Sequence, residues 1–320
     1  MNKDIAIIGC GLIGRKRALA FPEQVKKVFD IDQKKSTKLA SEINCVSVNA
    51  IDEILEDKEI KNVVVATTHD SLFEITKKCA FKLKNVLVEK PGCKNLKEAR
   101  ELLAFQKKLK VKIYVGFNHR FHESFLEIKR ELAKKDYGEL MFIRGRYGHG
   151  GRLGYEKEWR ANKKISGGGE LVDQGSHLID LSLFFEDKFK YYKSHNETFF
   201  WNMDVEDNAF LMLKSKKSIS WLHASWTEWK NLFSFEIYFK KAKFHVEGLG
   251  GSYGQETLTK YFMKDEMGMP EIEQNFYDNE DMSWTKELDT FLNSNDNLSF
   301  KGCSINELVK IWEIIESSYK

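Results

Sequence analysis

The sequence predicts an α/β protein in which a doubly wound, parallel sheet is followed by a second domain with antiparallel strands. Over residues 1–118, short aliphatic runs alternate with helical patterns, as in parallel sheets that are buried on both faces. A glycine-rich turn follows the first of these runs directly. Beyond residue 118 the apolar runs lie closer together and are separated by short turns that contain lysine. Such spacing is typical of an antiparallel meander.

Each element of the first part is identified by its hydrophobic pattern. Continuous aliphatic runs indicate buried strands, whereas apolar residues that recur every three or four positions indicate helices. The expected strands are residues 5–8, 25–31, 63–66, 86–88 and 112–115. The expected helices run from the glycine turn to about residue 21, and then over residues 33–43, 51–57, 71–83 and 95–109.

The same patterns locate the elements of the second part. Helices are expected over residues 121–135, 169–185 and 305–319. Strands are expected over residues 140–147, 209–213, 218–226, 233–239 and 244–246. A chain of 320 residues is long enough for two domains, each with its own core. We place the domains at residues 1–118 and 119–320, with the closing helix over 305–319 able to pack back on the first domain.

Composition and charge indicate an ordinary globular protein. Hydrophobic residues make up 42% and charged residues 31%, and the formal net charge is only +3. No block of basic residues predicts a nucleic-acid or membrane partner. No signal peptide or membrane span is recognisable, and the five cysteines show no Cys-x-x-Cys spacing. We therefore expect a soluble, cytoplasmic protein with reduced thiols.

The glycine-rich turn is the first candidate site. Gly9-x-Gly11-x-x-Gly14 lies between an expected strand and an expected helix, which is the context of a dinucleotide-binding loop. Glycines let the backbone turn sharply and approach a pyrophosphate closely. The helix N-terminus, which begins with Leu12 and Ile13, would stabilise the negative charge.

A carboxylate at the end of the second strand indicates which dinucleotide binds. Asp30 can bind both hydroxyls of a ribose and would repel a 2′-phosphate, so NAD is the expected cofactor. Asp32 is the alternative ribose ligand, because strand ends are predicted only to within a residue or two. Lys34 and Lys35 stand nearby and weaken the discrimination, which leaves NADP as the alternative cofactor.

Glu89-Lys90-Pro91 directly follows the expected strand over residues 86–88. Open α/β sheets bind ligands at the carboxyl ends of their strands, so Lys90 can direct its ammonium group at a bound ligand. Oxidation of an alcohol builds alkoxide character as hydride leaves, and a fixed ammonium group stabilises that charge. We therefore expect Glu89 and Lys90 to contact the cofactor, and Lys90 also to contact the substrate and act in catalysis.

Gly167-Gly-Gly169 precedes Asp173 and His177 in an expected helix. Residues four apart lie on one face of a helix, so the carboxylate could orient the imidazole or hold a substrate. A histidine, with an ordinary pKa of about 6.5, is suited to proton transfer near neutral pH. The glycines would let the backbone approach a ligand closely. We expect both Asp173 and His177 to be catalytic and to contact the substrate.

A metal ion is the alternative interpretation of Asp173 and His177. Their spacing allows two ligands, and His69 or His149 could supply a third. Spacing does not place either histidine there, and transfer of hydride to a nicotinamide needs no metal. We therefore expect no metal.

A glycine-containing segment before this helix is a candidate substrate loop. Arginine forks suit carboxylates or phosphates, and aromatic rings suit the faces of sugars. The segment could equally be a surface excursion without a binding role. Its candidate substrate-binding residues are Arg152, Tyr155, Trp159 and Arg160.

Taken in order, the glycine turn, Glu89-Lys90-Pro91, Gly116-Phe-Asn118-His-Arg120-Phe121 and the segment from Gly167 to His177 resemble the Gfo/Idh/MocA family. This family takes its name from glucose–fructose oxidoreductase, inositol dehydrogenase and rhizopine catabolism. The resemblance covers about the whole chain. It implies an N-terminal Rossmann domain, with a doubly wound parallel sheet, and a C-terminal α/β domain with an open, mostly antiparallel sheet. Such a sheet often mediates dimers or tetramers.

The resemblance also implies roles for individual residues. The catalytic lysine, aspartate and histidine of the family correspond to Lys90, Asp173 and His177, and Asn118 corresponds to a pocket residue. Arg120 is expected to line the same pocket. After its third strand the family often carries Thr-Pro-Asn. Here the equivalent cofactor-binding residues are Thr67, Thr68 and His69, so the loop departs from the family in detail.

The implied activity is that of an NAD(P)-dependent dehydrogenase or reductase that acts on CH–OH groups. Its substrate would be a sugar, a cyclitol or a nucleotide sugar, and Trp159-Arg160 favours a precursor of surface polysaccharides. A homodimer or homotetramer is expected. Two alternatives stay open: a redox-neutral, NAD-dependent glycosidase or eliminase, and a non-catalytic NAD-binding regulator. The complete set of Lys90, Asp173 and His177 argues against the regulator.

Overall fold

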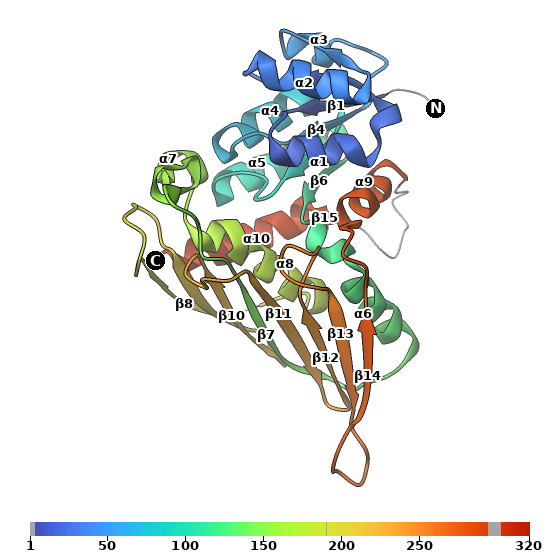
Figure 1. The fold of residues 1–320 in the computed structure, drawn as a ribbon, viewed down its shortest axis with the longest axis vertical. Coiled ribbons are helices and arrows are strands. Elements are labelled where there is room, and N and C mark those ends of the chain that lie inside the picture. Colours follow the sequence, from blue (N-terminus) through green and yellow to red (C-terminus); the bar gives the residue numbers. More distant parts are fainter. Residues whose placement is uncertain (1–3, 190, 294–301) are drawn as a thin grey trace. The chain divides into compact units, whose positions relative to one another are not determined.

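The computed structural model describes residues 4–189, 191–293 and 302–320 (Figure 1). The chain forms two compact units. Unit 1 comprises Met1–Asn118 and Trp284–Trp312, and unit 2 comprises His119–Ser283 and Glu313–Lys320. Within the described ranges, no helix has the length and hydropathy that crossing a bilayer requires.

Unit 1 is built on a sheet to which the described residues contribute seven strands, in the order β3-β2-β1-β4-β5-β6-β15. The neighbours from β3 to β6 are all parallel. This is the strand order of a doubly wound sheet, whose direction of winding reverses between β1 and β4. The strands are β1 (Ile5–Ile8), β2 (Val25–Phe29), β3 (Val46–Ser47), β4 (Asn62–Val65), β5 (Asn85–Glu89), β6 (Ile113–Gly116) and β15 (Cys303–Ser304).

The helices of unit 1 alternate with its strands, as the sequence predicts. Helices α1 and α2 contact each other, and so do α4 and α5. Helix α10 begins in unit 1 and ends in unit 2. The helices are α1 (Leu12–Ala20), α2 (Gln33–Ile43), α3 (Asp52–Leu55), α4 (His69–Phe81), α5 (Leu96–Leu109), α9 (Ser283–Asn293) and α10 (Ile305–Ser318).

Part of the second half of the chain belongs to unit 1, although the sequence pattern placed residues 119–320 in one domain. β15 extends the sheet by pairing antiparallel with β6. Leu288 and Phe291 of α9 join the core that contains Ile5 and Val28. Contacts between distant segments, rather than local pattern, decide which unit these segments join, so the sequence pattern alone does not reveal it.

A buried ionic cluster connects α9 with α1 and β5. Arg17 of α1 is completely buried, and its Nη2 lies 2.6 Å from carboxylate oxygens of both Glu89 and Glu287. The guanidinium also lies over the ring of Trp284, 4.6 Å from its centroid. Burial alone would lower the pKa of Arg17, but the two carboxylates raise it above its ordinary value. Arg17 therefore stays charged and joins three elements that are distant in sequence.

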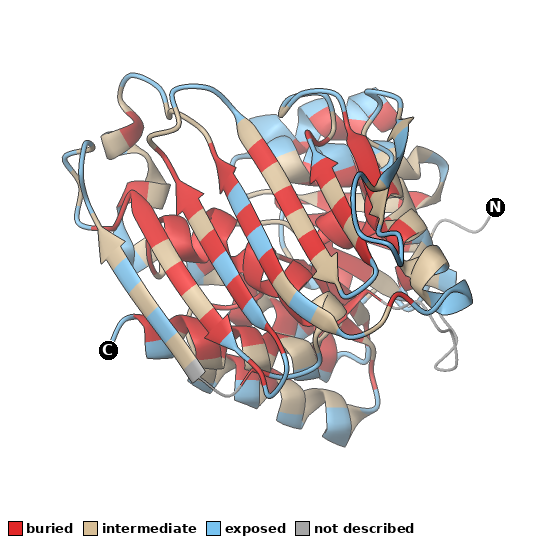
Figure 2. Cartoon of the chain, turned by 90° about the horizontal axis from the view of Figure 1, so that it is seen from below, coloured by how far each residue is buried: buried red, intermediate tan, exposed pale blue. Residues whose placement is uncertain are grey.

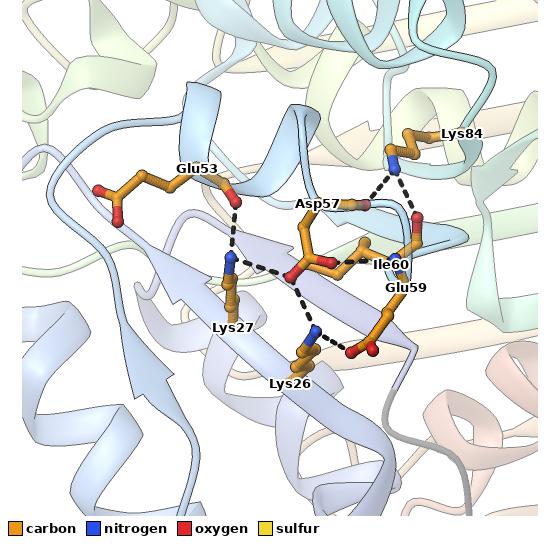
Figure 3. Close-up of polar contacts among 7 residues, drawn as sticks. All are labelled: Lys26, Lys27, Glu53, Asp57, Glu59, Ile60 and Lys84. Carbon is orange, nitrogen blue, oxygen red and sulfur yellow. Dashed lines mark hydrogen bonds and ion pairs between the residues drawn. The ribbon is translucent and has the colours of Figure 1, made fainter.

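A second polar cluster lies at the amino ends of the strands of unit 1 (Figure 3). Lys26 and Lys27, at the start of β2, lie 2.8 and 2.9 Å from the Asp57 carboxylate. The hydrogen bond from Lys26 is the main cause of the depressed pKa of Asp57. Lys84, just before β5, donates to the backbone oxygens of Asp57 and Ile60, each at 2.6 Å. These contacts hold the α3–β4 loop at the edge of the sheet opposite to the glycine turn.

Unit 2 is built on a second sheet, in which eight strands are described in the order β14-β13-β12-β11-β7-β10-β9-β8. Along each central strand, buried and accessible residues alternate, as expected for a sheet with one packed face (Figure 2). Helices α6 (Glu123–Lys134) and α8 (Ser176–Phe185) contact this sheet. The strands are β7 (Leu140–Gly148), β8 (Tyr191–Glu197), β9 (Asn208–Lys214), β10 (Ile219–Ser225), β11 (Leu232–Phe239), β12 (Ala242–Glu247), β13 (Thr257–Phe262) and β14 (Glu271–Phe276).

The predicted meander is interrupted by β7. This strand lies between β10 and β11, parallel to the first and antiparallel to the second. Gly145, in the middle of β7, allows this close packing, because an added Cβ would lie 3.0–3.1 Å from side chains of Phe235, Leu178 and Leu222. The α/β class with a Rossmann-like parallel sheet and a mostly antiparallel second sheet is nevertheless confirmed.

Candidate functional site

The predicted cofactor residues follow strands that end together at one edge of the parallel sheet. Ile8, the last residue of β1, pairs in register with Phe29 of β2 and with Val65 of β4. Val65 in turn pairs with Val88 of β5. The segments that follow these residues hold Gly9, Asp30, Thr67 and Lys90, so the edge where α/β sheets bind ligands carries these predicted residues.

The three glycines of the turn have different surroundings. A Cβ on Gly9 would lie 2.4 Å from the backbone oxygen of Ala66, and one on Gly14 would lie 1.8 Å from the oxygen of Gly9. Both positions therefore require glycine for packing. At Gly11, which precedes α1, a Cβ would meet no atom within 4 Å. The backbone at Gly11 is open for the approach of a pyrophosphate, so the turn fits the group it is predicted to hold.

The structure separates the two candidate ribose ligands. Asp30 accepts hydrogen bonds from the backbone N–H groups of Cys10, at 2.7 Å, and Asp32, at 2.8 Å. These contacts fix its carboxylate beside the glycine turn. Asp32 instead caps α2, since its side chain accepts from the backbone N–H of Lys34 at 3.1 Å. The geometry therefore favours Asp30 as the ribose ligand.

The remaining predicted residues of unit 1 have mixed surroundings. Thr67 and Thr68 are half-buried before α4, and the buried His69 is the first residue of that helix. Lys90 is half-buried in the turn after β5. Glu89 was expected to contact the cofactor, but its carboxylate binds the buried Arg17. We therefore do not carry Glu89 forward as a cofactor ligand.

The catalytic candidates of unit 2 lie at the start of its central helix. Asp173 is part of a π-helical turn, Leu171–Gly175, and His177 belongs to the first turn of α8. The sequence predicted one regular helix here; π-helical turns occur frequently at functional sites. Both side chains are largely buried, and α8 is buried from Ser176 to Leu183. Arg160, a predicted substrate ligand, lies with Nε 3.3 Å from Oδ2 of Asp173 and so holds that carboxylate.

The glycine run before this helix is packed against protein. A Cβ on Gly169 would lie 2.1 Å from the backbone oxygen of Glu206, and one on Gly168 would lie 2.2 Å from the hydroxyl of Tyr319. Oε1 of Glu206 accepts from the N–H of Gly169 and from the Tyr319 hydroxyl. Burial raises the pKa of Glu206. The glycines thus serve helix packing rather than the approach of a ligand that the sequence suggested.

Asn118 and Arg120, the two predicted residues of the next motif, are both buried. Asn118 is buried at the start of a 3₁₀ turn, Asn118–Phe121. Arg120 forms a two-pronged ion pair with Asp180 of α8, with Nη2–Oδ1 at 2.6 Å and Nε–Oδ2 at 2.9 Å. Because this pair is buried, it does not support the predicted role of Arg120 in substrate binding.

The candidate residues of the predicted substrate loop have different surroundings. Tyr155 is buried in an aromatic cluster with Trp226 and Trp201, which does not support contact with a substrate. Arg152 is exposed and pairs with Glu158 at 2.6 Å. Trp159 is half-buried, with the Arg160 guanidinium 4.4 Å from its ring centroid.

A hollow of about 740 Å³ lies beside this loop in unit 2. Lys157, Lys163 and Lys164 are among its lining residues.

Several neighbours of His177 were not predicted. The ring of His119 lies 3.8 Å from that of His177, centroid to centroid, and Tyr147 of β7 contacts both rings edge-on. His119 belongs to a motif that the sequence singled out for Asn118 and Arg120 alone, and the motif is the one signal that could have found it. In the described ranges, no group of three or more His, Cys, Asp or Glu side chains is arranged to hold a metal ion.

Comparisons with known proteins identify the two halves of the chain. Residues 3–117 match the model of an oxidoreductase family with an NAD-binding Rossmann fold. Residues 125–245 match the GFO/IDH/MocA C-terminal domain.

Curated relatives are similar over part of their length. The chain is 30% identical over 195 residues to glucose-6-phosphate 3-dehydrogenase of Bacillus subtilis (strain 168), which covers 58% of this chain and 55% of that protein. It is 24% identical over 203 residues to levoglucosan dehydrogenase of Pseudarthrobacter phenanthrenivorans, which covers 59% and 52%. The matches thus span about half the length of these relatives.

Solved structures show the same fold over the whole chain. Levoglucosan dehydrogenase in complex with NADH and levoglucosan superposes with a TM-score of 0.86 at 18% identity, over 100% of this chain and 96% of that one. UDP-N-acetylglucosamine 3-dehydrogenase from Acidithiobacillus ferrooxidans superposes with a TM-score of 0.82 at 17% identity, over 98% and 95%. Since the family models match both domains, the chain belongs to the Gfo/Idh/MocA oxidoreductase family and carries its NAD-binding Rossmann domain.

Proposed function

We propose that this protein is an NAD-dependent dehydrogenase or reductase that transfers hydride between the nicotinamide and a secondary alcohol or ketone of a sugar, cyclitol or nucleotide sugar. The observation that carries the proposal is the shared edge of the parallel sheet, which bears the open backbone of Gly11 and the fixed carboxylate of Asp30 together with Lys90. The named activities of two relatives, on glucose 6-phosphate and levoglucosan, support the substrate class.

We assign one step of the reaction to each catalytic candidate. Bound NAD would accept the hydride from the carbon that carries the hydroxyl group. His177 takes the hydroxyl proton as the carbonyl bond forms, and Lys90 stabilises the negative charge that develops on the oxygen. Asp173, which Arg160 holds at 3.3 Å, orients the reacting group. Of the other substrate-binding candidates we retain Asn118, Arg152, Trp159 and Arg160.

The test is to titrate the purified protein with NAD and NADP and then to screen sugars, sugar phosphates and nucleotide sugars for formation of reduced nicotinamide. Turnover on one class of sugar is the expected result and would name the substrate. Tight binding of NAD with no net reduction on any of these compounds would contradict the proposal. It would favour a redox-neutral enzyme if product still forms, and a regulator if none does.

The choice of cofactor is expected to depend on Asp30. Asp30→Asn keeps an acceptor for one backbone N–H group but removes the charge that repels a 2′-phosphate. We expect the affinity for NAD to fall about tenfold, as a hydrogen bond to a charged group is lost, and the preference over NADP to shrink. Calorimetric titration with both dinucleotides measures this. Asp32→Asn is the matched control, because Asp32 caps α2 and should not set the preference.

We also propose that the protein is a homodimer or homotetramer that associates through the open face of the sheet in unit 2. Ile219 and Trp221 of β10, and Ile272 and Phe276 of β14, are apolar side chains between 38% and 62% exposed. Exposed apolar side chains that recur over a sheet are typical of surfaces between protein subunits. Sedimentation equilibrium of the purified chain measures its mass in solution.

A further inference from the structure

Three buried histidines lie side by side in unit 2. His119 is 6% exposed and His177 is 4% exposed. Their ring centroids are 3.8 Å apart, and the ring of His122 lies 5.7 Å from that of His119. The three residues come from two segments, the turn that precedes α6 and the first turn of α8.

Aromatic side chains surround the contact between His119 and His177. Tyr147 lies with its ring centroid 5.2 Å from that of His119 and 5.9 Å from that of His177. Phe233 lies 5.8 Å from His119, and Tyr253 lies 4.9 Å from Tyr147. Burial raises the pKa of Tyr147 well above its ordinary value and that of Tyr253 to about 12. Both hydroxyls therefore stay neutral near pH 7 and offset no positive charge on the histidines.

Two carboxylates engage His122, the next ring along. Its Nδ1 lies 2.8 Å from Oε2 of Glu256, and its Nε2 lies 3.9 Å from Oδ1 of Asp281. Glu256 also accepts from the backbone N–H of Ser124 at 2.8 Å. Burial would raise the pKa of Glu256, but these hydrogen bonds lower it. Glu256 is thus an ionised group whose contacts are with His122 and Ser124.

The two aspartates nearest to His177 along the chain each lie beside an arginine. Asp173 lies 3.3 Å from Arg160, and Asp180 lies 2.6 Å from Arg120. Glu170 is buried just before the π-helical turn, where its charge helps to raise the pKa of Tyr147 and of Tyr253. Because each aspartate is paired with a guanidinium group, neither strongly attracts a positive charge on the histidine pair.

Like charges at this separation interact strongly inside a protein, because little water lies between them to screen the interaction. Two imidazolium rings with centroids 3.8 Å apart would therefore repel each other. We propose that His119 is a positioning residue for His177, and that the two rings take up at most one proton between them near neutral pH. Groups coupled in this way lose their protons in two steps that belong to the pair.

The consequence for catalysis rests on the proposed function, in which His177 accepts the hydroxyl proton. When the pair carries its one proton, His177 is neutral for the part of the time that the proton resides on His119. A proton acceptor is then present at a pH where a single histidine would be fully protonated. We therefore expect kcat/KM to fall through a shoulder on the acid side, rather than in one step.

The test is a pH titration of the 320-residue chain in which NMR monitors histidines labelled at Cε1. In the wild-type protein, the signal of His177, assigned through its loss in His177→Gln, is expected to move in two steps about two pH units apart. In His119→Phe, which keeps a ring but removes the charge, we expect a single step. His119→Gln is the second variant and keeps a polar side chain in case the phenylalanine does not fold. A single step with the same midpoint in wild type and variant overturns the proposal.

Activity and controls separate this proposal from the proposed function. If the wild-type protein turns over no sugar, the titration still decides whether the histidines are coupled, and the function is what fails. Where turnover is measured, His119→Phe is expected to lose about tenfold in kcat/KM per pH unit on the acid side, without the shoulder. A profile that superimposes on that of the wild type contradicts the proposal. His195→Gln is the control; His195 is 71% exposed on β8 and should change neither readout.

Discussion

Replacing Lys90 with methionine is expected to lower kcat with the true substrate by about 10²–10³-fold. Methionine keeps an unbranched side chain but has no ammonium group to stabilise the oxygen as hydride leaves. Lys90 lies in the turn after β5, at the edge of the sheet where the glycine turn and Asp30 also lie. Steady-state kinetics at saturating NAD measure the effect. Calorimetry should show binding of NAD within a few-fold of wild type.

Two further variants make this result interpretable. Lys78→Met on α4 removes an exposed lysine of the same unit and should leave kcat unchanged. His177→Gln should lower kcat by a similar factor, since it removes the proposed proton acceptor. A Lys90→Met protein that retains the wild-type kcat would show that the assigned role of Lys90 is wrong, whatever the behaviour of His177.

Replacing Arg17 with leucine is expected to lower the free energy of unfolding by about 3–5 kcal/mol. Arg17 is completely buried, and its loss leaves the carboxylates of Glu89 and Glu287 without the cation that offsets them. Unpaired buried carboxylates must be protonated or drawn into water, and both cost free energy. Denaturant unfolding monitored by far-ultraviolet circular dichroism measures the change.

The physical cause is checked by a compensated variant. Arg17→Leu combined with Glu89→Gln and Glu287→Gln leaves no buried charge in the cluster and should recover most of the lost stability. Arg15→Leu on the same helix is the matched control, because Arg15 is exposed and pairs with Glu42 at the surface. If the triple variant is no more stable than Arg17→Leu, loss of packing rather than unpaired charge explains the effect.

Much of unit 1 could be predicted because its elements follow from local pattern. Unbroken aliphatic runs identified β1, β4 and β5, and the strand–glycine–helix sequence identified the turn at Gly9. A carboxylate one residue beyond the end of β2 pointed to Asp30, whose surroundings in the structure favour the ribose role.

Less of unit 2 could be predicted, because its arrangement depends on contacts between distant segments. The spacing of the strands along the sequence does not indicate that β7 lies between β10 and β11 in the sheet. The histidine at 119 was visible within a motif, but nothing local indicated that its ring lies against His177. The glycines before the π-helical turn looked like a ligand-binding segment, and only the fold shows that Glu206 and Tyr319 pack on them.

By itself the sequence determined the class of fold, the order of the elements around the glycine turn, and the residue types at the edge where a dinucleotide binds. These features depend on periodicity and on neighbours along the chain, which a sequence contains in full. Only the tertiary structure decided which charged side chains form ion pairs within the protein and which can bind a ligand. Glu89 pairs with Arg17, 72 positions away, and Arg120 pairs with Asp180, 60 positions away. A charged side chain in a motif takes a role in binding or in folding according to the partner that the folded chain brings to it, and that partner is not encoded nearby.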